Sequence, residues 1–376
     1  MDSVKLAGLG LTALRSNFAR LDRPYKLTFS ITYSCQSRCL TCNIWQIKPT
    51  GELDLREITA FAQKNNYFKW VEITGGEPFL RSDIVDIVKA FKDNSKDLYI
   101  VTMPTNSLCN PDMVAGRIES ILQLGIPKVS ITLSLDGYRE LHDKIRGIPG
   151  NFDRVMGMAK RLKEMQSRYR NLFFVFGYTM SKYNEGKLME TIAQVQKELP
   201  WVTANNFHVN VGQTSDTYYK NSDMQLKPDV AGFVGELDQF LKARRPEIGA
   251  IPIVENAFLK RLGYYIKTGN SPMRGRSLDA SLFMDSYGNV FPSIMWNRKI
   301  GSIREADYDL SKIWHNSEAE EVRKLIAQGK EPGAWTACEA YQTLVGNIWI
   351  GHNPPLLCFL SSCSTLSMEK RFRSCP

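Results

Sequence analysis

The amino-acid sequence predicts an α/β protein built on a parallel sheet. Between residues 25 and 211, short apolar runs rich in β-branched and aromatic residues alternate with amphipathic segments of helical length. This alternation is typical of βα units, in which a helix follows each strand and packs on the sheet. The expected strands span residues 26–32, 70–74, 98–102, 129–135, 172–178 and 207–211. The expected helices span residues 53–63, 82–91, 111–123, 151–165 and 185–197.

A separate preface, residues 1–24, comes before the first strand. Leu11, Leu14, Phe18 and Leu21 recur there at helical spacing, with basic residues between them. This pattern predicts either a helix that packs on the domain or one that lies on a membrane surface.

The sequence changes character after the sixth expected strand. Residues 216–280 are more polar and are expected to be helical in part. From residue 281 the pattern predicts a hairpin that turns at residues 287–289, followed by a short helix over residues 309–328. After Gly333 we expect an irregular tail, which holds Cys338, Cys358, Cys363 and Cys375.

The composition excludes several classes of protein. No uninterrupted apolar run among the 376 residues approaches the roughly 20 that a membrane span needs, and the N-terminus lacks the pattern of a signal peptide. We therefore expect a cytoplasmic protein, with peripheral membrane contact as the alternative. Eight cysteines in a reducing compartment indicate metal binding rather than disulfides. The net charge of +9 indicates a solvated surface or an anionic partner, such as nucleic acid or phospholipid.

The clearest chemical motif is a group of three thiols. Cys35, Cys39 and Cys42 have the spacing C-x3-C-x2-C and come directly after the first expected strand. Three thiolates can hold three irons of a [4Fe-4S] cluster and leave the fourth iron free for an exogenous ligand. The alternative is a zinc-binding structural or interaction module, in which a histidine completes a tetrahedral site.

The order of motifs along the chain resembles the radical S-adenosylmethionine (SAM) enzymes. The three-thiol motif matches the cluster loop of that family, and turns that follow the next three expected strands match its SAM-binding segments. These turns contain Gly75, Gly76, Glu77 and Pro78, then Thr105, Asn106 and Ser107, then Ser134, with Arg146 shortly after. His142 and Asp143, between the last two, are expected on the surface or at the start of a helix.

The resemblance implies a partial (β/α)6 TIM-type barrel and a defined chemistry. Cys35, Cys39 and Cys42 would hold the cluster, and SAM would chelate the free iron. Gly75, Gly76, Glu77 and Pro78 would contact the amino group of SAM, while Asn106, Ser134 and Arg146 would bind near its ribose or carboxylate. A low-potential donor such as ferredoxin or flavodoxin would supply an electron. SAM cleavage would then give a 5′-deoxyadenosyl radical that abstracts hydrogen from the substrate.

The C-terminal part resembles the SPASM or twitch extension of these enzymes, a small α+β cap. The scaffold around the Gly288–Asn289 turn matches, but Ser293 and Ala334 stand where the resemblance leads us to expect cysteine. A hydroxyl and a methyl group cannot replace thiolates, so a second Fe–S cluster is not expected. Cys338, Cys358, Cys363 and Cys375 match no motif.

The expected organisation has four parts. These are the preface at residues 1–24, the core barrel at 25–215, a helical connecting region at 216–280 and the SPASM/twitch-like extension at 281–376. The resemblance implies an enzyme of the oxidoreductase or transferase type. Its substrate is unassigned among peptides, small molecules and lipid-linked compounds, and a SAM-binding barrel without turnover is a further alternative.

Overall fold

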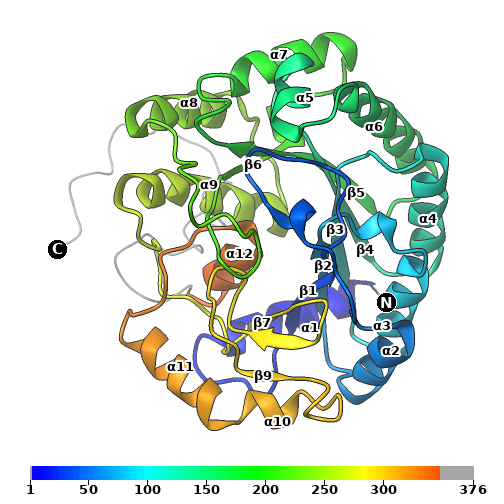
Figure 1. Ribbon diagram of the computed structural model, residues 1–376, viewed down its shortest axis with the longest axis vertical. Coiled ribbons are helices and arrows are strands. Elements are labelled where there is room, and N and C mark those ends of the chain that lie inside the picture. Colours follow the sequence, from blue (N-terminus) through cyan, green and yellow to red (C-terminus); the bar gives the residue numbers. More distant parts are fainter. Residues whose placement is uncertain (1, 348–376) are drawn as a thin grey trace.

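The computed structural model describes residues 2–347 and contains the parallel sheet that the sequence predicts (Figure 1). Six neighbouring strands pair in parallel in the order β6-β5-β4-β3-β2-β1, and helices surround the curved sheet, which does not close. The strands are β1 (Lys26–Thr32), β2 (Trp70–Gly75), β3 (Ile100–Thr105), β4 (Lys128–Ser134), β5 (Leu172–Met180) and β6 (Phe207–Val211). The prediction of a partial (β/α)6 barrel is thus confirmed.

Helices cover the outer face of this sheet. They are α2 (Leu55–Lys64), α3 (Ile84–Asn94), α4 (Pro111–Gln123), α5 (Glu140–Arg146), α6 (Asn151–Arg168) and α7 (Leu188–Glu198). Short 3-10 helices span Ile44–Gln46, Pro78–Leu80 and Ala204–Asn206. The apolar faces of the α-helices pack on the sheet and form the main hydrophobic core with it.

The inner face of the sheet is left partly exposed. In β2, Val71 and Ile73 are buried under the helices, whereas Trp70, Glu72 and Thr74 alternate with them and remain partly exposed. The same alternation runs through β4, β5 and β6. Because successive side chains of a strand point to opposite faces, the partly exposed set lines the inside of the barrel, where a ligand can be received.

The chain after residue 280 extends the same sheet. Strand β7 (Ser281–Met284) pairs in parallel with β1, and β8 (Asn289–Phe291) and β9 (Gly301–Ser302) add antiparallel strands, which confirms the predicted hairpin. The single helix expected over residues 309–328 is wrong. It is divided into α10 (Ser311–Trp314) and α11 (Ser317–Ala327), because the Asn316 side chain accepts a hydrogen bond from the Ala319 backbone and caps a new helix.

Four further helices complete the described chain: α1 (Asp2–Arg15), α8 (Val230–Ala243), α9 (Ala250–Thr268) and α12 (Ala337–Val345). The irregular tail expected after Gly333 is therefore wrong over α12. This helix lies at the amino ends of the barrel strands, where Lys26 Nζ donates to the Cys338 carbonyl oxygen and the Tyr341 ring stacks near Trp70. These contacts are long-range and leave little trace in the local sequence.

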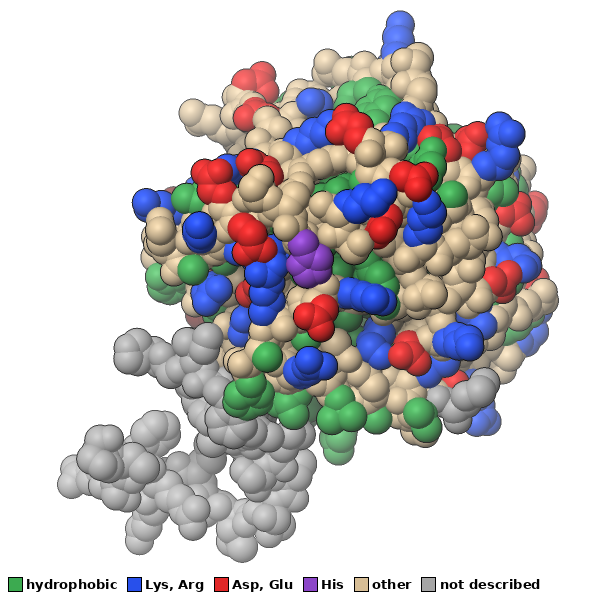
Figure 2. Space-filling model, turned by 90° about the horizontal axis from the view of Figure 1, so that it is seen from below, with side chains coloured by type: hydrophobic (Ala, Val, Ile, Leu, Met, Phe, Trp, Pro, Cys, Tyr) green, Lys and Arg blue, Asp and Glu red, His purple; other side chains and the backbone are tan. Residues whose placement is uncertain are grey.

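The predicted N-terminal helix packs on the domain. Ala13 and Leu21 join a small cluster with Tyr25, while Leu11 and Phe18 are exposed. Acidic and basic side chains are interspersed over the face that Figure 2 presents, as on an ordinary solvated surface. Within residues 2–347, no helix is both long and apolar enough to cross a membrane.

Candidate active site

The three thiols lie in an irregular loop at the carboxyl end of β1. Cys35, Cys39 and Cys42 are all partly exposed and form no disulfide. Burial raises the pKa of Cys35 and of Cys42 to about 12, and the neighbouring Cys39 thiol adds to both shifts. The thiols are thus close enough to influence one another, and a cation in the loop would have to displace their protons.

The end of α5 holds one side of this loop. The Arg146 carbonyl oxygen accepts from the Arg38 backbone N–H at 2.9 Å and from the Ser37 hydroxyl at 3.1 Å. The next residue, Gly147, has φ 70°, and a Cβ atom there would lie 2.5 Å from the Arg38 carbonyl oxygen. Only glycine permits this approach, so α5 and the thiol loop are fixed to each other through backbone contacts.

The two glycines after β2 hold the other side of the loop. Gly76 N–H donates to the Thr32 carbonyl oxygen at 2.7 Å. A Cβ atom at Gly76 would lie 2.2 Å from the Ser34 carbonyl oxygen, and one at Gly75, whose φ is 145°, would lie 2.2 Å from the Thr32 carbonyl oxygen. Both positions therefore require glycine for packing against the chain that leads into the thiols.

The Glu77 carboxylate joins the ends of β2 and β3. It accepts from the Asn106 backbone N–H at 2.7 Å and from the Phe79 N–H at 3.2 Å. The side chain is 1% exposed, and burial raises its pKa to about 7. Asn106 in turn brings its Nδ2 atom to 3.8 Å from Cys35 Sγ. Ser107 has φ 60°, a left-handed conformation that residues other than glycine seldom adopt.

Arg146 lies beside the thiol loop but is shared with an acidic residue. Its Nε atom is 2.7 Å from Asp136 Oδ2, and its Nη1 atom is 3.7 Å from Cys39 Sγ. Burial opposes the charged form, but Asp136 and Cys39 outweigh it and raise the pKa of Arg146 above its usual value. Ser134 is partly exposed at the end of β4. Sequence reasoning missed Asp136, although it comes two residues after Ser134.

His142 lies in the first turn of α5, as the helix-start alternative predicts, but the surface alternative is wrong because this side chain is fully buried. Its Nδ1 atom accepts from the Asp136 backbone N–H at 3.1 Å, and its Nε2 atom lies 3.1 Å from Asn151 Oδ1. Burial lowers the pKa of His142 to about 3, so the imidazole is neutral. Asp143 accepts from the Phe152 N–H at 2.8 Å and supports the start of α6.

A segment that sequence reasoning missed also contacts the thiol loop. The Tyr218 hydroxyl lies 2.7 Å from Thr74 Oγ1 and donates to the Gly75 carbonyl oxygen at 2.9 Å. The Tyr219 carbonyl oxygen accepts from the Asn43 N–H at 2.9 Å. This segment follows β6 and has no periodic pattern, so its only indication in the sequence is the pair of adjacent tyrosines.

The alternative to a cluster is a site in the described part of the chain that could hold a single metal ion. Within residues 2–347, no group of three or more His, Cys, Asp or Glu side chains could hold one metal ion. Three thiolates of a [4Fe-4S] cluster each bind a different iron, so they do not need to meet at one point.

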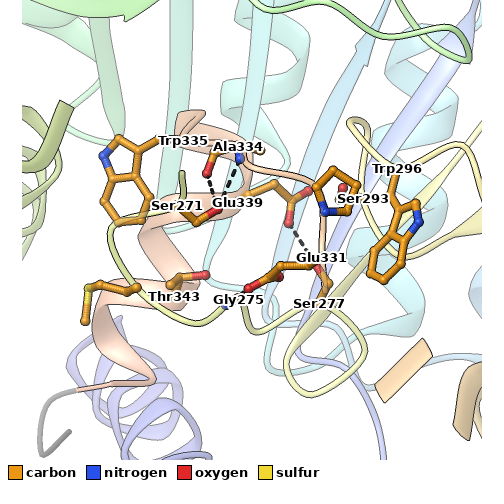
Figure 3. Close-up of a pocket in the computed structure, with 12 residues that line it drawn as sticks. Ser271, Gly275, Ser277, Ser293, Trp296, Glu331, Ala334, Trp335, Glu339 and Thr343 are labelled. Atoms are coloured by element: carbon orange, nitrogen blue, oxygen red, sulfur yellow. Dashed lines mark hydrogen bonds between the residues drawn. The ribbon is translucent and has the colours of Figure 1, made fainter. Parts of the chain in front are cut away.

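The two positions at which the family resemblance predicts cysteine lie close together in space. Ser293 and Ala334 line the same small cavity, shown in Figure 3, although they are far apart in the sequence. Cys338 is not among its lining residues, and its thiol instead donates to Glu72 Oε1 at 3.0 Å. Cys358, Cys363 and Cys375 lie outside the described residues.

Comparison with known protein families agrees with this geometry. Residues 29–195 match the model of the Radical SAM superfamily, a stretch that contains the thiol loop and the turns after β2, β3 and β4. This segment is a radical SAM domain. As a radical SAM protein it is an enzyme, and the family implies a [4Fe-4S] cluster and SAM as its cofactors.

The curated relatives of this radical SAM enzyme carry different chemistries. An AdoMet-dependent heme synthase of Methanosarcina barkeri is 27% identical over 352 residues, which cover 87% of this chain and 92% of the relative. A GTP 3′,8-cyclase of Limosilactobacillus fermentum is 34% identical over 139 residues, 34% of this chain and 38% of the relative. Mycofactocin maturase MftC of Mycolicibacterium smegmatis is 29% identical over 151 residues, 38% of this chain and 35% of the relative.

Solved structures share the fold. The enzyme anSMEcpe with bound AdoMet superposes with a TM-score of 0.56 at 17% identity, over 81% of this chain and 84% of that one. Streptococcus suis SuiB bound to S-adenosylmethionine gives a TM-score of 0.54 at 16% identity, over 85% of this chain and 72% of that one. At these identities the likeness concerns the fold alone.

Proposed function

We propose that this radical SAM enzyme cleaves SAM reductively at one [4Fe-4S] cluster held by Cys35, Cys39 and Cys42, and abstracts hydrogen from its substrate. The observation that carries the proposal is the thiol loop itself. Its thiols come from one strand end and its backbone is fastened to the turns after β2 and α5. When bound, the cluster and SAM supply a 5′-deoxyadenosyl radical, and the protein supplies position and seclusion.

The proposed SAM contacts surround this loop. Gly75, Gly76, Glu77 and Pro78 would lie along the methionine amino group, with Asn106, Ser134 and Arg146 at the neighbouring strand ends. Glu77 accepts a hydrogen bond from the Asn106 backbone, and Arg146 forms an ion pair with Asp136. Their contribution is therefore to orient the site as well as to contact the ligand, and backbone carbonyl groups beside the glycines are suited to an ammonium group.

A single cluster is proposed because Ser293 and Ala334 stand where the family resemblance predicts cysteine. Ser293 and Ala334 face one cavity without a thiol of the described residues among its lining. The substrate is proposed to be a peptide, a small molecule or a lipid-linked compound, and a ferredoxin- or flavodoxin-like protein is proposed as electron donor. The reaction is of the oxidoreductase or transferase type. The protein is proposed to be cytoplasmic, with peripheral membrane contact as an alternative.

The decisive experiment counts iron and sulfide after anaerobic purification and reconstitution. In parallel, dithionite and SAM are added and 5′-deoxyadenosine is measured. The matched variant replaces Cys35, Cys39 and Cys42 with alanine, and a Cys109→Ala variant serves as control, because Cys109 is a buried thiol outside the motif. We expect about four irons per chain and deoxyadenosine formation, both lost in the triple variant and kept in the control.

Three other outcomes would change the proposal. About eight irons, half of which survive in the triple variant, would contradict the single cluster. Zinc in place of iron, with no deoxyadenosine, would favour the structural module. Four irons and bound SAM without deoxyadenosine would favour a barrel that binds SAM without turnover.

A further inference from the structure

The cavity that contains Ser293 and Ala334 is bounded by three separate segments. The segment between α9 and β7 contributes Ser271, Gly275 and Ser277, and the chain after β8 contributes Ser293 and Trp296. The segment from Glu331 through α12 contributes Glu331, Trp335, Glu339 and Thr343, among others (Figure 3). On α12, Glu339 and Thr343 are four residues apart and therefore share the face toward the cavity.

Two carboxylates line this cavity and neither forms an ion pair with any residue in 2–347. Glu331 Oε1 accepts from the Gly275 N–H at 2.7 Å, and Glu339 Oε2 accepts from the Ser277 hydroxyl at 3.1 Å. Burial raises the pKa of both, that of Glu339 to about 8, against the opposing charge of Lys26. Because charged acids are costly to bury without a counter-ion, a cation bound in the cavity would stabilise their ionised forms.

A third polar group points to a ligand. Thr343 is 3% exposed and lines the cavity, yet its hydroxyl has no hydrogen-bond partner within residues 2–347. The hydroxyl is therefore free to accept a hydrogen bond from a group in the cavity. The Trp296 and Trp335 indoles supply aromatic walls, which attract a cation placed against the ring face.

The size of the cavity limits what it can hold. The volume open to the centre of a water molecule is about 30 Å³, and one water needs about 10–15 Å³ by this measure. The space therefore suits a group of about two heavy atoms. We propose that the cavity binds a protonated primary amino group, with Glu331 and Glu339 as counter-ions and the Thr343 hydroxyl as an acceptor. This site is separate from the thiol loop and does not rest on the proposed radical chemistry.

The test uses methylammonium as the probe and the reconstituted full-length protein at pH 8.5, above the pKa of about 8 of Glu339. Thermal unfolding and titration calorimetry are measured at constant ionic strength with methylammonium, tetramethylammonium or sodium chloride. Methylammonium should bind saturably and raise the Tm, whereas tetramethylammonium is too large and sodium lacks N–H donors. Equal effects of all three cations would overturn the proposal, and a stronger effect of sodium would identify a metal-ion site instead.

Variants locate the binding. Glu331→Gln and Glu339→Gln should each weaken methylammonium about tenfold or more, which is about 1.4 kcal/mol. The control Glu247→Gln removes an exposed carboxylate elsewhere and should leave binding unchanged. If one variant fails to fold, Thr343→Val tests the same site without a charge change and should also weaken the probe. Unchanged binding in the folded variants would refute the assignment, and deoxyadenosine formation, measured in parallel, reports separately on the radical SAM chemistry.

Discussion

The Nε atom of Arg146 lies 2.7 Å from the Oδ2 atom of Asp136, and the Asp136 side chain is only 2% exposed. The same guanidinium brings Nη1 to 3.7 Å from the sulfur of Cys39. Asp136 also accepts from the Thr179 backbone N–H, so one carboxylate joins the end of β4, the chain of β5 and the cation beside the thiols. The position of Arg146 near the cluster loop therefore depends on Asp136.

Replacing Asp136 with asparagine should destabilise the protein by about 3–5 kcal/mol, because it leaves a buried guanidinium without its counter-ion. Urea unfolding of the purified protein measures this change. The control is Arg161→Gln, which breaks the exposed pair between Arg161 and Asp112 and should cost below about 1 kcal/mol. If both variants lose the same small amount of unfolding free energy, the Asp136–Arg146 pair does not stabilise the protein measurably.

Replacing Gly76 with alanine should lower the iron content after reconstitution. The added Cβ atom would lie 2.2 Å from the Ser34 carbonyl oxygen, so the thiol loop would have to move away from β2. In the control Gly116→Ala, nothing lies within 4 Å of the new Cβ on α4, and alanine favours the helix by about 1 kcal/mol. Iron analysis and thermal unfolding of both variants make the comparison. Full iron loading in Gly76→Ala would contradict the role assigned to this contact.

Replacing Lys26 with methionine should destabilise the protein, and more so as the pH rises. Lys26 is fully buried and lies 2.8 Å from Glu72. Burial acts to raise the pKa of Glu72, but Lys26 and hydrogen bonds keep it below the usual value. Without Lys26 this pKa rises, so the folded variant must bind a proton or keep an unpaired charge above about pH 4.5.

The unfolding free energies of Lys26→Met and wild type, measured at pH 5 and pH 8, should therefore differ more at pH 8. The exposed Lys160→Met variant is the control and should show no such trend. A difference that is independent of pH would show that Glu72 is not the group responsible.

The unfolding free energy of the wild-type protein should decrease as the pH rises, because the Glu339 carboxyl then loses its proton. Burial raises the pKa of this carboxyl to about 8, above its unfolded value near 4.5. Between these values the folded state binds more protons than the unfolded state, so unfolding free energy decreases as pH rises, by at most about 1.4 kcal/mol per pH unit. Glu339→Gln should gain stability relative to wild type between pH 5 and pH 8. If the unfolding free energies of Glu339→Gln and wild type, measured in urea, change with pH in parallel, the raised pKa of Glu339 is contradicted.

Local patterns were sufficient for the main elements of the barrel. The bounds expected for the first and sixth strands, residues 26–32 and 207–211, are those of β1 and β6. Both are bounded by polar or turn-forming residues that local reasoning recognises. The helix over residues 309–328 failed because a cap at Asn316 competes with helix continuation. Local patterns missed the burial of His142, because it depends on contacts with Asp136 and Asn151 that arise only when β4, α5 and α6 pack together.

The sequence by itself determined the thiol spacing, the order of strands and turns, and hence the superfamily. Each of these is a property of near neighbours along the chain, such as the alternation in a strand or the spacing of Cys35, Cys39 and Cys42. Only the tertiary structure decided that Asp136 holds Arg146, that Tyr218 closes on Gly75, and that Ser293 and Ala334 meet in one acidic cavity. These contacts join distant residues, and their geometry follows from the packing of the whole sheet and its helices rather than from any local pattern.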